Sequence, residues 1–232
     1  MTALLIILAK EPLPGQVKTR LSPPLSPEEA AQLYHSFLID ILEEMARVPE
    51  VRLAVAFSPP GAQVWFRGLA PPGTILFPQE GADLGERMAQ AFAQGFAAGL
   101  GPVLLRGSDV PDLPAAVISE AKEVLAAGRA QVVLGPATDG GYHLVGLTEP
   151  QPRLFQGPAW SSSTVLADTL RLARQMDLRV HLLPPWPDID TADNLRTFLN
   201  LPRPAPQPGW RSFQKARSLL GRLGPNQPEP VG

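Results

Sequence analysis

The sequence predicts a three-layer α/β fold, in which helices cover both faces of a mostly parallel sheet. Short apolar runs typical of strands alternate with runs of helical periodicity, the pattern of parallel strands joined by helical crossovers. Several strand-like runs are apolar at nearly every position, which indicates that both faces of the sheet are buried. One strand-like run follows another with no helix between them, so we expect one antiparallel strand.

The expected elements occupy the first 200 residues. Strands are expected at 3–9, 51–57, 74–77, 102–106, 131–135, 142–147 and 179–183, and helices at 27–47, 83–99, 114–127, 162–176 and 191–200. The first helix has the clearest start, because Ser26 can cap it, Pro27 suits its first turn and Glu29 lies near the positive end of its dipole. The run YHLVGL, at 142–147, is the expected antiparallel strand.

Composition excludes several classes of function. With 232 residues, the chain fits one large domain or a domain with an appendage. Its net charge of −2 argues against general nucleic-acid binding, which needs a basic excess. It has no cysteine, which excludes disulfides, cysteine-ligated metals and a thiol nucleophile. Residues 2–9 are too short for a membrane span and lack a preceding basic segment, so we expect a buried strand and a cytoplasmic protein.

The character of the sequence changes after residue 200. We therefore expect one domain at 1–200 and a tail at 201–232, which opens with a proline-rich linker. A short basic helix follows, with these apolar residues roughly on one face: Trp210, Phe213, Leu219, Leu220 and Leu223. We favour docking of this helix on the domain or a neighbouring subunit over contact with a membrane surface. The oligomeric state stays open, a homo-oligomer included.

A basic loop follows the first expected strand. Its sequence, AKEPLPGQVKTRL at 9–21, carries Lys10, Lys18 and Arg20, while prolines and Gly15 restrict its path. It is not a Walker A loop, because proline and valine occupy the positions where that pattern requires glycine. We predict that the three cationic side chains bind phosphate groups of a ligand and that Gly15 belongs to the same binding loop; a solvated basic loop is the alternative.

Acidic residues follow three later strands, whose carboxyl ends meet at one edge of the sheet. They are Asp109, Asp139 with Gly140 and Gly141, and Asp190. Carboxylates near a cationic loop suit a nucleoside triphosphate or diphosphate with Mg²⁺ between them, or Mn²⁺ in its place. The two glycines would allow close approach of a base or a sugar, with a tight Asp-Gly turn as the alternative.

Five motifs in this order resemble those of a bacterial transferase family. They read A-K-x-P-x-P-G-x-V-K-T-R-L, G-S-D-x-P-x-L, G-P-A-x-D-G-G-Y-x-L-x-G-L, W-S-x-x-x-V and D-I-D-T. From residue 4 to about 200 the chain resembles the radical-SAM/selenodomain-associated transferase 1 family. That family is similar to nucleotide-diphospho-sugar transferases, whose relatives include 2-phospho-lactate guanylyltransferase and molybdenum cofactor guanylyltransferase.

The resemblance implies a glycosyltransferase A-like, Rossmann-like fold and a transferase that depends on Mg²⁺ or Mn²⁺. It implies that Lys10, Lys18 and Arg20 bind nucleotide phosphates. It also implies that Asp109 holds the metal and that Asp190 completes the metal site.

The middle strand departs from the glycosyltransferase pattern, since Ser108-Asp109-Val110 stands where such enzymes carry Asp-x-Asp. The basic first loop is also more similar to that of nucleotidyltransferases. We therefore favour nucleotidyl transfer from a nucleoside triphosphate to a phosphate or hydroxyl group of a small-molecule acceptor. The alternatives are glycosyl transfer from a nucleotide-sugar and a non-catalytic nucleotide-binding protein. Trp160 and Ser161 are candidates for the acceptor pocket, with the core as the alternative for Trp160.

Overall fold

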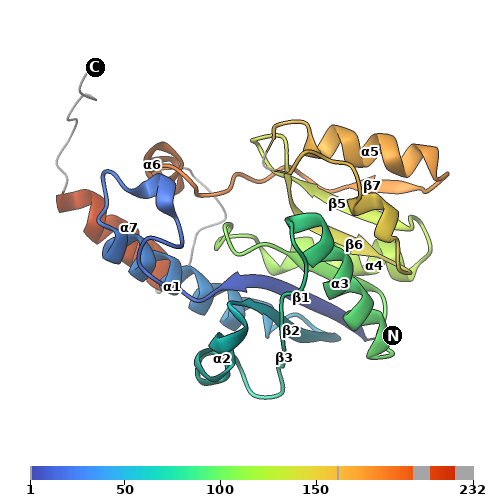
Figure 1. Ribbon diagram of the computed structural model, residues 1–232, viewed down its shortest axis with the longest axis horizontal. Helices are drawn as coiled ribbons and strands as arrows, with labels where there is room; N and C mark the ends of the chain where they lie inside the picture. Colours follow the sequence, from blue (N-terminus) through green and yellow to red (C-terminus); the bar gives the residue numbers. More distant parts are fainter. Residues whose placement is uncertain (1, 161, 201–209, 223–232) are drawn as a thin grey trace.

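The computed structural model describes residues 2–160, 162–200 and 210–222. A seven-stranded sheet lies between two layers of helices, with the strand order β3-β2-β1-β4-β6-β5-β7 (Figure 1). The strands are β1 (Ala3–Lys10), β2 (Val51–Ser58), β3 (Ile75–Pro78), β4 (Val103–Arg106), β5 (Val132–Pro136), β6 (Tyr142–Leu147) and β7 (Val180–Leu182). The expected three-layer fold is confirmed.

Seven α-helices occur in the described residues. They are α1 (Pro27–Met45), α2 (Gln63–Leu69), α3 (Leu84–Ala97), α4 (Ala115–Ala126), α5 (Val165–Gln175), α6 (Ala192–Asn200) and α7 (Arg211–Arg222). The expected cap of α1 is present as a full capping box, because Ser26 and Glu29 each bond the other's backbone N–H. Sequence reasoning missed α2, which is only seven residues long and is held by burial of Phe66.

The direction of each strand decides which loops meet at the site. All neighbouring pairs are parallel except those of β6, which runs antiparallel to both β4 and β5. The expected antiparallel strand is therefore confirmed. Because β6 runs in reverse, its first residue, Tyr142, lies at the same sheet edge as the last residues of β1 and β4.

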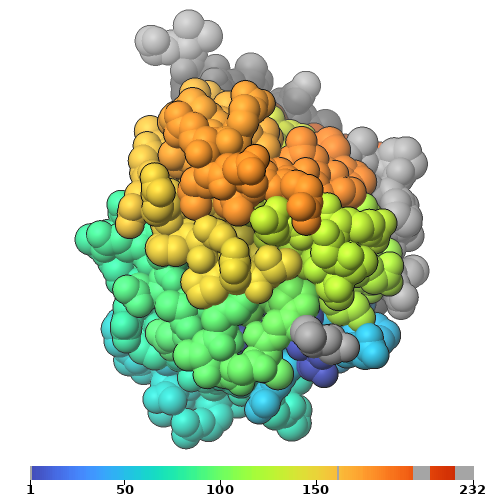
Figure 2. Space-filling model, turned by 90° about the vertical axis from the view of Figure 1, so that its right-hand side faces the viewer, coloured from blue at the N-terminus to red at the C-terminus, as the bar shows by residue number. Residues whose placement is uncertain are grey.

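The sheet is buried on both faces, which explains its uniformly apolar strands. On one face, Leu5 and Ile7 of β1 pack with α1, α4, α6 and α7. On the other face, Leu4 and Ile6 pack with α3, α5 and the short 3₁₀ helix η3 (Pro152–Phe155). Figure 2 shows α3 (green), the segment before α5 (yellow) and α5 (orange) lying against one another on this side.

The tail forms a helix that docks on the domain. Helix α7 contacts α1 and α6, and it buries Ala216 and Leu219 in the core. Its first backbone N–H groups, at Arg211 and Ser212, donate to the buried carboxylate of Asp40 on α1. The buried residues of the tail helix thus pack against the domain within the chain. The expected linker at 201–209 and Leu223 lie outside the described residues, and no described helix is long and apolar enough to cross a membrane.

Candidate active site

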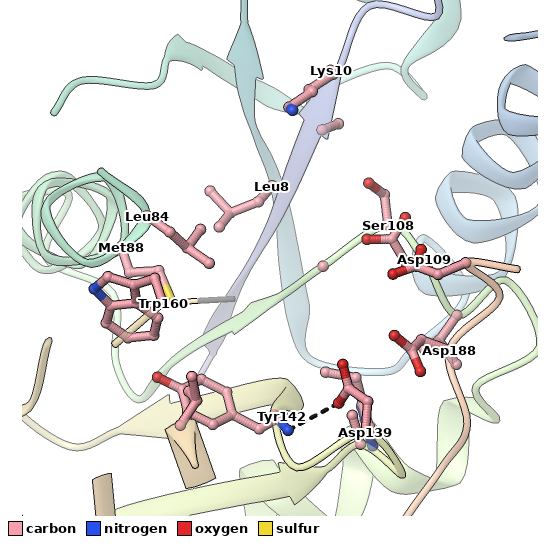
Figure 3. Close-up of a pocket in the computed structure, with 18 of the residues that line it drawn as sticks. Leu8, Lys10, Leu84, Met88, Ser108, Asp109, Asp139, Tyr142, Trp160 and Asp188 are labelled. Carbon is pink, nitrogen blue, oxygen red and sulfur yellow. Dashed lines mark hydrogen bonds between the residues drawn. The ribbon is translucent and has the colours of Figure 1, made fainter. Parts of the chain in front are cut away.

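A deep cleft of about 820 Å³ opens at the carboxyl ends of β1 and β4 (Figure 3). From these two adjacent strands the chain continues in opposite directions along the sheet, from β1 to β2 and from β4 to β5. Such a switch point is where ligands bind in open α/β sheets. The cleft receives the loop after β1, the loop after β4, the β5–β6 hairpin and the segment before α6. The cleft therefore lies at the edge of the sheet where the sequence places the candidate site residues.

The ammonium group of Lys18 joins two carboxylates of the cleft that lie far from it in the sequence. The Nζ of Lys18 contacts Oδ1 of Asp109, and it lies 2.8 Å from Oδ1 of Asp190 and 2.6 Å from the carbonyl oxygen of Ile189. The Lys18 side chain is only 3% exposed, whereas the side chains of Asp109 and Asp190 are 48% and 34% exposed. The structure thus brings together three of the predicted site residues, with the lysine beneath the carboxylates.

Local backbone geometry positions Lys18. Its φ angle of 49° is left-handed, and the 3₁₀ turn η1 (Thr19–Leu21) begins directly after it. Such a conformation is unusual for a lysine and needs support from the surrounding structure. The support comes from the ion pairs and from Phe37, whose ring centroid lies 5.5 Å from Nζ.

The ion pairs keep Lys18 charged in its buried position. Burial lowers its pKa, but the two aspartates raise it by more, so the net pKa lies above the ordinary value for lysine. The ammonium group is therefore a permanent cation between the carboxylates at physiological pH.

Lys10 and Arg20 differ from Lys18, since both are exposed and line the cleft. Lys10 ends β1, and its backbone N–H donates to the hydroxyl of Tyr34 at 3.1 Å. That hydroxyl also lies 2.6 Å from Oγ of Ser108, so Tyr34 ties the loop after β1 to the loop after β4. Two cationic side chains are thus available for an anionic ligand at the mouth of the cleft.

The loop after β4 is fixed from below by Arg106, which is 1% exposed. Its guanidinium group donates to the carbonyl oxygens of Gly107 and Val110, on either side of Asp109. Burial lowers the pKa of Arg106 to about 10. The backbone N–H of Ile189 donates to the carbonyl oxygen of Asp109 at 3.0 Å, so this loop and the segment before α6 are joined by their main chains.

The structure of the Asp139 segment favours a tight Asp-Gly turn over a contact with a base or sugar. Asp139 accepts a hydrogen bond from the backbone N–H of Gly141 at 2.9 Å, as in an Asx turn, and the turn joins the hairpin strands β5 and β6. Gly140 has a φ angle of 93°, and a Cβ on it would lie 2.0 Å from the carbonyl oxygen of Ser163. The close approach that glycine permits here is therefore to the protein's own backbone.

The other predicted binding residues are divided between the cleft and its surroundings. Asp139 and Gly141 line the cleft, whereas Gly15 and Gly140 are not among its lining residues. Gly15 instead supports the turn of the basic loop with its φ angle of 73°. Trp160 lines the cleft while packing on the core beneath α3, and Ser161 lies outside the described residues.

Sequence reasoning missed Asp188 as a site residue. It lines the cleft two positions before Asp190, and burial, followed by the charges of Asp139 and Asp190, raises its pKa to about 6. The string Asp188-Ile189-Asp190 was visible, but its order in the chain did not indicate that both carboxylates face one cleft. Ile189 between them is buried, so alternation along an extended segment points both aspartates to the same side.

The raised pKa of Asp188 predicts a stability effect in the metal-free protein. Its folded-state pKa exceeds the unfolded value, so ionisation destabilises the fold above about pH 6 and this penalty disappears as the pH falls toward 4. We expect Asp188→Asn to raise the unfolding free energy at pH 7.5 by about 1 kcal/mol, after allowance for solvent screening of a half-buried group. This corresponds to a melting temperature about 2–4 °C higher.

Melting curves of Asp188→Asn and the unmodified protein in chelator, at pH 7.5 and pH 5, measure the difference. It should shrink at pH 5, where the native aspartate is protonated. The control is Asp193→Asn on α6, whose carboxylate is 89% exposed. Equal melting temperatures at pH 7.5 would show that ionisation of Asp188 does not destabilise the fold.

The site fits a divalent cation with oxygen ligands. Asp109, Asp190 and the carbonyl oxygen of Ile189 already surround one cationic centre, the ammonium group of Lys18. Within the described residues, no three acidic or histidine side chains are arranged to hold a metal by themselves. Two carboxylates suit Mg²⁺ in particular, because it keeps several waters and shares its coordination with substrate phosphates.

Comparison with protein-family models gives a match over residues 41–162, more than half of the chain. The matching family is described as an uncharacterized protein conserved in bacteria, DUF2064. The chain belongs to the DUF2064 family. A comparison with curated proteins found no match.

Solved structures show which fold this DUF2064 protein shares. A Desulfovibrio desulfuricans G20 protein, provisionally described as a nucleotide-diphospho-sugar transferase, has a TM-score of 0.88 and 31% identity, covering 95% of this chain and 96% of that one. CMP:2-keto-3-deoxy-manno-octonic acid synthetase with CTP has a TM-score of 0.57 and 10% identity, covering 97% and 100%. A cytidylyltransferase from Leptospira borgpetersenii has a TM-score of 0.53 and 12% identity, covering 98% of both chains.

The two more distant similarities show the fold alone. The Desulfovibrio protein, at 31% identity, supports the nucleotide-diphospho-sugar transferase superfamily for this DUF2064 protein. The narrower resemblance to the radical-SAM/selenodomain-associated transferase 1 family stays a prediction.

Proposed function

We propose that this DUF2064 protein is a transferase that uses a nucleotide-activated donor, with nucleotidyl transfer from a nucleoside triphosphate to a small-molecule acceptor as its reaction. The observation that carries the proposal is the arrangement at the switch point of the sheet. Lys10 at the end of β1 and Arg20 in the loop after it line the same cleft as Asp109 and Asp190. Cations and carboxylates in one cleft suit a phosphate chain that is held directly by the cations and through a metal by the carboxylates.

The chain's own residues would act chiefly by position and charge. Arg20 has the fork geometry for two hydrogen bonds to one phosphate, whereas Lys10 acts as a point charge. Ser108 and Tyr34 fix the spacing of the two loops that carry these groups and Asp109. In phosphoryl-type transfer such positioning and charge stabilisation supply most of the rate enhancement.

Asp109 and Asp190 would hold Mg²⁺ or Mn²⁺, which supplies charge neutralisation on the phosphates when bound. Lys18 would neutralise the same two carboxylates in the metal-free protein. A phosphate contact by Lys18, as the sequence predicts, would require its ammonium group to leave these partners.

Glycosyl transfer from a nucleotide-sugar is the second candidate. The Desulfovibrio protein at 31% identity, with its provisional description as a nucleotide-diphospho-sugar transferase, favours it. In that reaction the same cations and carboxylates would stabilise a departing nucleoside diphosphate. The identity of the leaving group separates the two candidates, since nucleotidyl transfer releases pyrophosphate.

A thermal-shift panel tests the proposal. GTP, CTP, UTP, ATP and common nucleotide-sugars are each measured with and without Mg²⁺, and a ligand at about 100 times its Kd should add roughly 2.7 kcal/mol of stability. We expect a triphosphate to stabilise best, and only with Mg²⁺. Arg20→Gln should lose most of this shift, whereas Arg129→Gln, an exposed arginine outside the cleft, should keep it. A larger shift with a nucleotide-sugar would favour glycosyl transfer, and no shift with any ligand would contradict both reactions.

A further inference from the structure

One side of the cleft is apolar, in contrast to its charged side. We call this side the apolar wall; its residues are Leu8, Leu84, Met88, Tyr142 and Trp160. Figure 3 shows Leu84, Met88 and Trp160 grouped together, across the cleft from Ser108, Asp109 and Asp188. A ligand that fills the cleft therefore meets carboxylates at one end and hydrocarbon at the other.

The exposure of Leu84 is the clearest indication that the apolar wall is a binding surface. Three large hydrophobic residues are exposed within the described part of the chain, namely Val64, Leu84 and Leu182. Of these, Leu84 alone lines the cleft, with 43% of its surface exposed. Single exposed apolar residues need no explanation, but one that continues a wall of partly buried apolar side chains in a cleft indicates a binding surface.

Trp160 is held as a fixed platform in this wall. Its indole ring lies against the first turn of α3 at Gly85, where a Cβ would come within 2.5 Å of Nε1 and 2.8 Å of Cε2. The same Cβ would lie 2.3 Å from the carbonyl oxygen of Phe155. Glycine is a poor helix former, so its place here follows from this close contact rather than from helix propensity. The ring is thereby seated flush on the helix and presents an apolar surface to the cleft.

Some polar groups that line the cleft beside the wall are already bonded within the protein. The amide nitrogen of Gln79 donates to the carbonyl oxygens of Ala9 and Ala56, and Nε of Arg87 donates to that of Gly81. The Ser162 hydroxyl lies 2.9 Å from Oγ1 of Thr164. The hydroxyl groups of a sugar, or the polar edges of a nucleobase, would find these bonded atoms engaged, and such groups are costly to bury unpaired.

We infer that the acceptor of the proposed transferase carries a flat apolar ring, which packs against Trp160 and Leu84 while its phosphate or hydroxyl group faces the charged side of the cleft. The inference rests on the proposed function for the word acceptor, but the apolar preference of the wall is independent of it. An aromatic ring suits the platform because offset stacking on an indole adds to the burial of apolar area.

Calorimetric titration in the presence of Mg²⁺ with phenyl phosphate and glucose 1-phosphate, which carry the same phosphate group, tests the inference without any nucleotide. Phenyl phosphate should bind at least about tenfold more tightly, with a negative heat-capacity change. Leu84→Glu should remove this preference. It should still fold, because residue 84 is the first of α3 and an acid is favourable at a helix N-terminus. Val64→Glu on α2, 77% exposed and outside the cleft, is the matched control and should leave both affinities unchanged.

Two results would overturn the inference. Equal or tighter binding of glucose 1-phosphate would make the wall a sugar site. A loss of triphosphate stabilisation in Leu84→Glu as large as the loss of phenyl phosphate binding would assign the wall to the nucleobase. If no nucleotide stabilises the unmodified protein, the proposed function fails, while the phenyl phosphate titration still decides the chemistry of the wall.

Discussion

Asp109→Asn is expected to lower metal-dependent turnover by roughly 10³-fold or more while the protein stays folded. The substitution keeps the size of the side chain but removes the charge that would hold the metal against the phosphates, and that charge stabilisation is a major part of transfer chemistry. The fold should tolerate it because the Asp109 side chain is 48% exposed and the buried Lys18 keeps its contact with Asp190. Its main-chain bond to Ile189 does not depend on the carboxylate.

Initial rates with the best nucleotide from the panel, over a range of Mg²⁺ concentrations, measure the effect. Asp168→Asn is the matched control, since that carboxylate is 29% exposed, pairs with Arg171 on α5 and lies outside the cleft. Its rate should stay within about twofold of the unmodified protein. Turnover of Asp109→Asn within tenfold of normal, with an unchanged melting temperature, would remove Asp109 from the metal site.

Much of the fold follows from patterns that act locally. Runs such as VRLAVAF at 51–57 have a length and composition that suit a buried strand, and Ser26 with Glu29 marks a helix start whatever surrounds it. Helix α2 escaped prediction because seven residues are too few to show a helical period, and tertiary contacts of Phe66 stabilise it. Helix α2 depends on tertiary packing, which a local sequence pattern does not reveal.

The edge that carries the site was predictable, but the contacts within it were not. Strand direction alone places Lys10, Asp109 and Asp190 at one edge. Lys18 and Asp190 are separated by 172 positions, and nothing in either segment indicates that one will lie beneath the other. Gly140 shows the same limit, since its conflict with the backbone of Ser163 exists only after the hairpin and the segment before α5 have packed.

The buried ammonium group of Lys18 leads to the second large effect. Lys18→Met keeps the hydrocarbon stem but leaves Asp109 and Asp190 close together without a cation. In chelator, we expect the variant to lose about 2 kcal/mol of unfolding free energy, less than for a fully buried pair because both carboxylates are partly exposed. Its melting temperature should fall by about 4–8 °C.

A divalent cation should restore more stability to Lys18→Met than to the unmodified protein. In the unmodified protein the ammonium group already occupies the space between the carboxylates and repels a second cation. Mn²⁺ binding without nucleotide, followed by electron paramagnetic resonance and by melting curves, should therefore be tighter in the variant. Lys122→Met is the control, because Lys122 pairs with Glu50, which is 68% exposed, and should cost less than 1 kcal/mol.

The same variant separates a counter-ion role for Lys18 from a phosphate-binding role. A counter-ion acts on the metal-free and nucleotide-free protein, so its loss appears in chelator and is repaired by metal alone. A phosphate ligand acts only when phosphates are present, so its loss would grow from nucleoside to monophosphate to triphosphate. Identical melting of the variant and the unmodified protein in chelator would contradict the counter-ion role, since the contacts of Lys18 with Asp109 and Asp190 would then contribute nothing to stability.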